Sequence, residues 1–200
     1  AARYDHTATL LGDGNVLVVC GWTGSTMASA EVFDPATGIF TPVGSMNTPR
    51  NQHRAVLLPS GSVLVMGGNN EASGNMATTE LFNPISAAFA PANSMNAVHT
   101  WFTADTLPDG RVLVVGGYDA SGQVQNTVEI YDPASASFSL TGSLNHPRAI
   151  HAAALLPGNR VLVAGGYHNV TGADSTAEVY DVATGEFQAA CRMAYERYSP

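Results

Sequence analysis

The sequence predicts an all-β protein built from four copies of one repeat, and three observations support this prediction. A multi-part residue pattern recurs from starts at positions 3, 50, 99, 148 and 197, so the period is 47 or 49 residues. Turn-forming residues are abundant, with 20 Gly and 11 Pro in 200 residues. No window shows the 3.6-residue periodicity of an amphipathic helix. Together these features favour many short strands separated by turns.

Each copy of the repeat carries the same parts in the same order. Three copies open on an Arg followed three residues later by a His, and the third copy has His99 and Phe102 instead. Fourteen residues after the His position comes a Gly pair or its variant: Cys20-Gly21, Gly67-Gly68, Gly116-Gly117 and Gly165-Gly166. A Glu follows in every copy: Glu31, Glu80, Glu129 and Glu178. Only the distance from the Gly pair to the Glu varies, so one loop absorbs the length change.

Four strands are expected in each unit, as the first copy illustrates. An alternating segment at 6–11 is followed by a Gly-rich turn and an apolar run at 16–19, which we expect to be buried on both faces. Segments 30–33 and 39–41 supply the third and fourth strands, and Pro35 ends the third. Four short antiparallel strands in 47–49 residues are typical of a propeller blade. The predicted blades span about 3–49, 50–98, 99–147 and 148–196, with the start of a further blade at 197–200.

These units resemble Kelch repeats, in the form common in bacterial Kelch-containing proteins. The resemblance is carried by the Gly pair after an apolar strand, the spaced Glu, the Tyr131-Asp132-Pro133 corner and the following Phe138. It extends from Arg3 to Pro200, so it covers residues 1–200 as a single Kelch domain or segment. The resemblance implies a Kelch-type β-propeller with four four-stranded antiparallel blades in this chain. It implies no single activity, because such propellers include binding modules and some enzymes.

Composition narrows the classes of partner. The eight basic residues are all Arg and stand against sixteen acidic residues, giving a formal charge of -8. This balance argues against nucleic acid or an anionic membrane surface as the main partner. No apolar stretch reaches the 18 residues of a membrane span, so we expect no membrane insertion. The low charge and the absence of Lys favour an extracellular or cell-surface protein.

Residues present in every copy are interpreted as scaffold, because a functional site rarely needs the same part four times. The four repeated Glu residues are therefore expected to bind backbone groups or Arg. His6, His53 and His151 head the first strand of their copies. Such histidines could ligate a metal around the propeller axis or could be hydrogen-bonded core residues. The prediction names no metal site and no cofactor.

Ligand-binding residues are predicted at one rim of the propeller. The second strand runs antiparallel to the first, so the loop after each Gly pair lies beside the segment that opens the repeat. These loops differ most between copies, as expected of a binding surface on a rigid scaffold. The aromatic residues of copy three suit stacking against a sugar or a peptide side chain, or are a packing variant. The predicted rim residues are Arg3, Trp22, Arg50, Asn69, Asn70, His99, Trp101, Tyr118, Asp119, Arg148, Tyr167 and His168.

The two cysteines and the closure of the ring are linked questions. Cys20 replaces the first Gly of its pair, and Cys191 lies in the segment after the fourth unit. In a closed ring of four blades the two would be neighbours and could pair, whereas in a larger ring they would be too far apart. An open arc of four blades exposes two apolar faces, so three arrangements stay open: a small closed ring, two copies completing eight blades, or part of a longer propeller.

The sequence favours a non-catalytic scaffold that presents its loop rim to a protein, peptide or glycan. It contains no nucleophile elbow, no phosphate-binding loop and no His-Glu-x-x-His motif, and no catalytic residue is assigned. One alternative is part of a copper-radical oxidase similar to galactose and glyoxal oxidases, or of another Kelch-propeller enzyme. However, Cys20 lies in the Gly-pair position and only Tyr167-His168 approaches the required pairing. Another alternative is a structural element that self-assembles.

Overall fold

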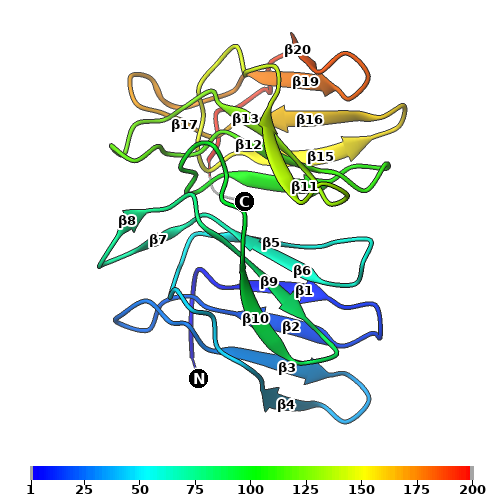
Figure 1. The fold of residues 1–200 in the computed structure, drawn as a ribbon. Helices are drawn as coiled ribbons and strands as arrows, with labels where there is room; N and C mark the ends of the chain where they lie inside the picture. The colour runs from blue at the N-terminus through cyan, green and yellow to red at the C-terminus, as the bar shows by residue number, and fades with distance from the viewer. Residues whose placement is uncertain (1, 199–200) are drawn as a thin grey trace.

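The computed structural model describes residues 2–198, and all regular secondary structure in this range is β. Of the predicted fifth opening at 197–200, residues 199 and 200 lie outside the described residues. The strands form four four-stranded sheets, which follow one another from the bottom to the top of Figure 1. No helix within residues 2–198 is long and apolar enough to cross a membrane.

Each sheet is a fully antiparallel meander whose strands lie within one copy of the repeat. The first sheet contains β1 (Thr7–Leu10), β2 (Val16–Val19), β3 (Ala30–Asp34) and β4 (Ile39–Pro42). The second contains β5 (Arg54–Leu57), β6 (Val63–Met66), β9 (Thr79–Asn83) and β10 (Ala88–Ala92). The third contains β11 (Thr103–Thr106), β12 (Val112–Val115), β13 (Val128–Asp132) and β14 (Ser137–Leu140). The fourth contains β15 (Ala152–Leu156), β16 (Arg160–Ala164), β19 (Ala177–Asp181) and β20 (Glu186–Ala189).

Two short hairpins were not predicted and lie in the loops after the Gly pairs. One joins β7 (Asn69–Asn70) to β8 (Gly74–Asn75), and the other joins β17 (Tyr167–His168) to β18 (Gly172–Ala173). Both project on the same side of the stack (Figure 1). With only two residues per strand, these hairpins show too little alternation to be recognised from sequence.

The hydrophobic core lies between the sheets. Three clusters of buried side chains fill the first-to-second, second-to-third and third-to-fourth interfaces. The innermost strands β1, β5, β11 and β15 contact one another in that order. Each cluster combines one face of a sheet with the opposite face of the next, so every inner sheet is buried from both sides.

The second strand of each sheet was expected to be buried on both faces, and this holds only in the middle of the stack. Every residue of β6 and β12 is buried, whereas burial alternates along β2 and β16. The prediction is therefore wrong for the first and fourth sheets. Burial alternates in these two sheets because each has a neighbouring sheet on one face only.

Candidate functional site: the loop rim

A buried ion-pair unit supports the segment that opens each repeat. In the fourth sheet the Arg148 guanidinium donates to the Gly165 carbonyl at 2.7 Å and to the Thr176 carbonyl at 3.1 Å. It also donates to Glu178 Oε1 at 3.0 Å, and both charged side chains are fully buried. Because these partners lie on two different segments of the fourth unit, the guanidinium ties the opening segment to the sheet.

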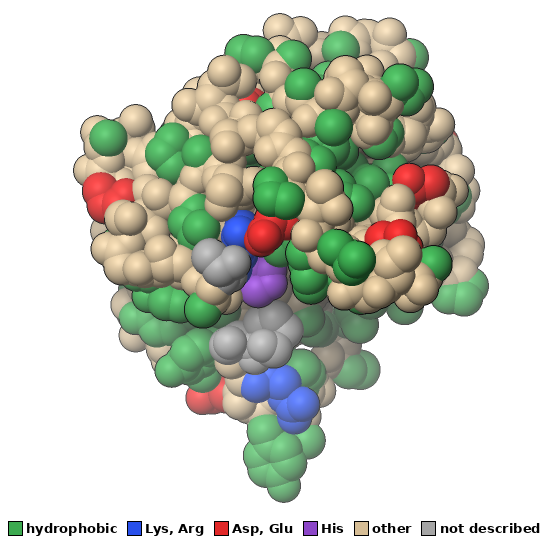
Figure 2. All heavy atoms as spheres, turned by 90° about the horizontal axis from the view of Figure 1, so that it is seen from below, with side chains coloured by type: hydrophobic (Ala, Val, Ile, Leu, Met, Phe, Trp, Pro, Cys, Tyr) green, Lys and Arg blue, Asp and Glu red, His purple; other side chains and the backbone are tan. Residues whose placement is uncertain are grey.

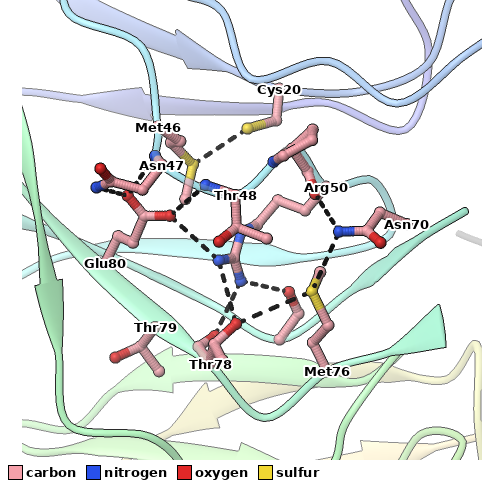
Figure 3. Close-up of polar contacts among 12 residues, drawn as sticks. Cys20, Met46, Asn47, Thr48, Arg50, Asn70, Met76, Thr78, Thr79 and Glu80 are labelled. Carbon is pink, nitrogen blue, oxygen red and sulfur yellow. Dashed lines mark hydrogen bonds and ion pairs between the residues drawn. The ribbon is translucent and has the colours of Figure 1, made fainter. Parts of the chain in front are cut away.

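The same unit recurs in the other sheets with small changes. Arg50 donates to the Gly67 and Thr78 carbonyls, and its guanidinium lies between Thr78 and Glu80 in Figure 3. In the third sheet His99 takes the place of Arg, with Nδ1 2.6 Å from the Gly116 carbonyl oxygen and Nε2 3.2 Å from Glu129 Oε1. Two side chains of different shape thus contact equivalent oxygens.

Each of these glutamates also binds the link from the preceding sheet. Glu129 accepts hydrogen bonds from the backbone amides of Asn96 and Ala97, both at 2.8 Å, and from Asn96 Nδ2 at 2.7 Å. Burial raises the pKa of the Glu129 carboxyl, but hydrogen bonds from His99, Asn96 and Ala97 outweigh it and bring the pKa below its usual value. The scaffold interpretation of the repeated Glu is confirmed by these contacts.

This arrangement corrects part of the predicted rim. Arg50, His99 and Arg148 are fully buried and Asn70 is 3% exposed, so their side chains are not on the rim surface. The side chains of Arg50, His99 and Arg148 instead contact carbonyl and Glu oxygens inside their sheets. Asn70 donates to the Pro49 carbonyl. Sequence position placed them correctly beside the rim loops, but a long side chain can turn inward as well as outward.

The repeated histidines differ in their surroundings. His53 Nε2 lies 2.9 Å from Thr7 Oγ1 and His151 Nε2 lies 3.0 Å from Thr103 Oγ1, so each links its sheet to the preceding one. Burial lowers the pKa of His151 to about 3 and that of His53 well below its usual value. These contacts confirm the core reading for both. His6, on the first sheet, is exposed.

Both cysteines are free within the described residues, so the pairing considered from the sequence is not present. Cys20 is buried with its Sγ 3.1 Å from Met46 Sδ, and Cys191 is exposed. Burial raises the pKa of the Cys20 thiol to about 12.

At each Gly pair the backbone lies close to the backbone of the segment that opens the repeat, and this contact forms the rim. Gly117 has φ +94°, and a Cβ added there would lie 2.5 Å from the Thr100 carbonyl oxygen. The residue that follows each pair then forms a β-bridge with the opening segment. These bridges are Tyr4–Trp22, Asn51–Asn69, Thr100–Tyr118 and Ala149–Tyr167. We call Trp22, Asn69, Tyr118 and Tyr167 the outer row.

The predicted rim residues that remain accessible gather around this row. All four side chains of the outer row are partly exposed, as are Trp101, Asp119 and His168. Burial raises the pKa of Tyr118, and the neighbouring Tyr167 raises it further. The Arg3 side chain points toward the first sheet, where it donates to Glu31 Oε2 at 2.7 Å. Whether these side chains contact a ligand stays a prediction.

The sequence reasoning missed a second row, next to the first. Asp5, Gln52, Trp101 and Ile150 all have φ between 53° and 55°, and we call them the inner row. Backbone hydrogen bonds run from Trp101 N to the Gln52 carbonyl at 3.3 Å and from Ile150 N to the Trp101 carbonyl at 2.9 Å. Only Trp101 was singled out from the sequence.

Spacing could have identified this row, because each member stands two residues after the start of its repeat. Four unrelated residue types share a backbone conformation that disfavours most side chains. Such strain is concentrated at functional positions in folded proteins.

Polar contacts join the rim loops of neighbouring sheets into one surface. The Thr26 amide donates to Glu71 Oε1 at 2.9 Å, and the Thr26 hydroxyl donates to Glu71 Oε2. Asn75 Nδ2 donates to the Asp119 carbonyl at 2.7 Å. Asn169 Nδ2 donates to Gln123 Oε1 at 2.7 Å. Within residues 2–198 no group of three or more His, Cys, Asp or Glu side chains is placed to hold a metal ion.

Comparison with known families agrees with this architecture. The Kelch motif matches residues 3–47 and 105–145, which confirms the predicted resemblance to the Kelch-repeat family. No curated protein matches the chain. The antiparallel four-stranded sheets and the two motif matches fit a Kelch-type β-propeller.

Proposed function

We propose that this chain, which carries Kelch repeats, is a non-catalytic scaffold that binds a protein or peptide segment on its loop rim, each sheet serving as one propeller blade. Kelch repeats generally mediate protein–protein binding. The observation that carries the proposal is the outer row, in which aromatic side chains occupy the same register position on three of the four loops.

The two rows have the properties of a binding surface. Trp22, Tyr118 and Tyr167 offer large amphipathic faces, and such side chains contribute most of the binding energy at many interfaces. The inner row lies directly beside them and is held by backbone hydrogen bonds between sheets. Because the loops are also tied to one another, a ligand would meet a largely preformed surface, which lowers the entropy cost of binding.

The repeated charged groups serve the scaffold and leave the rim to recognise shape and polarity. Glu80, Glu129 and Glu178 are occupied by the links and the opening residues of their units. The accessible ionic groups near the rows include Asp5 and Asp119, which agree in sign with the overall charge of -8. This sign favours ligands that do not carry a strong negative charge.

Selection from a peptide library displayed on phage tests the proposal, with the immobilised chain as bait. Enriched peptides are synthesised, and their affinity is measured by fluorescence polarisation against Trp22→Ala, Tyr118→Ala and Tyr167→Ala. We expect at least one of these variants to weaken binding by about 30-fold, the effect of losing one hot-spot side chain worth about 2 kcal/mol.

Ile85→Ala is the matched control, because Ile85 is 96% exposed in the turn between β9 and β10. It should leave affinity unchanged. Peptides that bind all three aromatic variants as tightly as the original chain would place the site elsewhere. A glycan array run in parallel separates the alternatives, since binding of glycans without any enriched peptide would contradict a peptide ligand.

A further inference from the structure

Two charged residues stand on inner strands at positions where the other units have uncharged side chains. Charged residues make up only 12% of the sequence, and Figure 2, which looks at the molecule from below Figure 1, shows few of them on that face. Arg54 on β5 has the same register as Thr7, Thr103 and Ala152. Asp105 on β11 has the same register as Thr9, Val56 and Ala154. Because parts shared by all units serve the scaffold, these two unshared charges are candidates for a separate role. We call Arg54 and Asp105 the axial pair.

Arg54 replaces one half of a hydrogen-bonded pair that joins inner strands elsewhere. In the first-to-second interface Thr7 Oγ1 lies 2.9 Å from His53 Nε2, and the third-to-fourth interface has the equivalent pair at 3.0 Å. Between the second and third sheets the two positions hold Arg54 and Phe102, and a phenyl ring cannot form this bond. Within residues 2–198 the one hydrogen bond of the Arg54 side chain goes to the neighbouring His53 carbonyl, at 3.3 Å. Most of its N–H donors therefore remain available.

Electrostatic effects place the Arg54 guanidinium near the centre of the inner strands. Burial lowers the pKa of Arg54, and the charges of Asp105 in the third unit and Asp5 in the first oppose this effect. Burial also lowers the pKa of His151 in the fourth unit, and the charges of Arg148 and Arg54 lower it further. A guanidinium that acts on groups of the first, third and fourth units lies close to the axis around which the inner strands are arranged.

Asp105 has an acceptor atom without a partner. Its Oδ2 is buried and accepts no hydrogen bond within the part of the chain that the structure describes. The strands β5 and β11 pack against each other, yet none of the ion pairs within residues 2–198 joins Asp105 to Arg54. A buried oxygen of this kind loses its hydration without compensation. Both residues remain partly exposed, so a ligand can reach the unsatisfied acceptor and the available donors.

The axial pair suits a neutral group that both accepts and donates hydrogen bonds. A carboxylate would be attracted by Arg54 but repelled by Asp105, and an ammonium group would meet the opposite conflict. A primary carboxamide has an acceptor oxygen and an NH2 donor on separate atoms, so it can bind both members of the pair at once. Each of these hydrogen bonds would have a charged partner, which makes it stronger than a bond between neutral groups.

We propose that the axial pair binds a primary carboxamide, the side chain of an Asn or Gln residue in a peptide held on the loop rim. The carboxamide oxygen accepts from the Arg54 guanidinium, and its NH2 group donates to Asp105 Oδ2. The inference rests on the proposed function for the peptide and adds the residue that the peptide places at the axis. The pair lies next to the inner row, since Gln52 stands two residues before Arg54 and donates to Asp5 Oδ2 at 3.5 Å.

Propionamide, a small primary carboxamide, tests the axial pair directly. It is titrated into the nitrogen-15-labelled chain, and NMR follows the Nε–Hε resonance of Arg54, which is assigned from its loss in Arg54→Met. We expect a saturable shift at millimolar concentrations, and no saturable shift with propionate or propylammonium over the same range. Asp105→Leu should weaken propionamide binding by about 10-fold or more, the effect of losing one hydrogen bond to a charged group.

Asp109→Leu is the matched control, because Asp109 lies in the turn after β11 and is 45% exposed. It should leave propionamide binding unchanged. Circular dichroism establishes that each variant is folded. Asp105→Asn, which keeps the size of the side chain and removes its charge, replaces Asp105→Leu if the latter does not fold, and it should also weaken binding. The absence of a saturable shift with propionamide, or an equal shift with propionate, would overturn the proposal.

The phage-selected peptides separate this inference from the proposed function. Replacing an Asn or Gln by Leu in a selected peptide should weaken its affinity for the original chain by about 10-fold, but not its affinity for Asp105→Leu. Peptides that depend on Trp22 or Tyr118 and tolerate every such replacement would contradict the carboxamide at the axis and leave the proposed function in place. Saturable propionamide binding without any selected peptide would support the axial pair and contradict the proposed function.

Discussion

At the scale of single residues, the repeated charged positions hold the loops rather than act on a ligand. Arg148 and Glu178 are fully buried, yet their polar groups contact carbonyls, amides and each other across two links. Sequence repetition was sufficient to identify the Glu as scaffold, because all four copies have it. The direction of the Arg side chain could not be derived, since an Arg beside a rim loop can reach solvent or the sheet with equal ease.

Replacing Arg148 with Met should destabilise the protein by about 3–5 kcal/mol, because Glu178 would keep a buried charge without its cation. The measurement is the free energy of unfolding in urea. Arg111→Met is the matched control, since the Arg111–Asp109 pair is 35% and 45% exposed and should contribute about 1 kcal/mol or less. Equal losses in both variants would contradict a structural role specific to Arg148.

Stability should depend on pH through the buried histidines. The pKa of His151 is about 3 in the folded chain against an ordinary value of 6.5, because burial disfavours the charged ring. Between pH 6.5 and pH 3 the unfolded chain therefore binds more protons than the folded chain. The contribution of the neutral His151 ring to the free energy of unfolding is complete above pH 6.5 and is lost as the pH falls toward 3. We expect His151 to lower the free energy of unfolding by about 2 kcal/mol between pH 7 and pH 5.

His151→Phe tests this pH dependence with a residue that the fold already accepts at Phe102. The variant should have a shallower fall in stability between pH 7 and pH 5 than the original chain. The control is His6→Phe, which changes an exposed ring and should leave the fall as it was. An unchanged slope in His151→Phe would show that this ring is not the titrating group.

At the scale of elements, the strands follow directly from the sequence. The strand β3 spans Ala30–Asp34 where 30–33 was predicted, and β4 spans Ile39–Pro42 where 39–41 was predicted. Period-two alternation and the flanking Gly and Pro were sufficient for this agreement. The short hairpins were missed because two residues per strand show no alternation. The inner row was missed because its backbone conformation accompanies hydrogen bonds between the opening segments of neighbouring repeats.

Gly117→Ala should be more damaging than Gly122→Ala, although both positions have positive φ. At Gly117 the added Cβ meets the Thr100 carbonyl, whereas at Gly122 nothing lies within 4 Å. We expect losses in the free energy of unfolding of about 3 kcal/mol or more and about 1 kcal/mol, respectively. Thermal unfolding of the two variants compares them, and similar losses would mean that strain alone, without close approach, determines the choice of Gly.

At the scale of the whole molecule, identical repeats acquire different surroundings. The apolar strand β12 is buried along its whole length, whereas β2 has the same sequence, Val-Leu-Val-Val, and is buried only at alternate residues. The difference comes from position in the stack. For the same reason burial also alternates along β16 of the fourth sheet, whereas every residue of β6 in the second sheet is buried.

The sequence by itself determined the period, the four strands of each unit, the antiparallel meander and the scaffold role of the Glu, because these depend on local pattern repeated four times. Only the tertiary structure decided that Arg50, His99 and Arg148 turn inward and that the inner row adopts positive φ. These properties arise between segments far apart in the chain. The repeat pattern specifies each unit, and what a side chain touches is determined by the unit beside it.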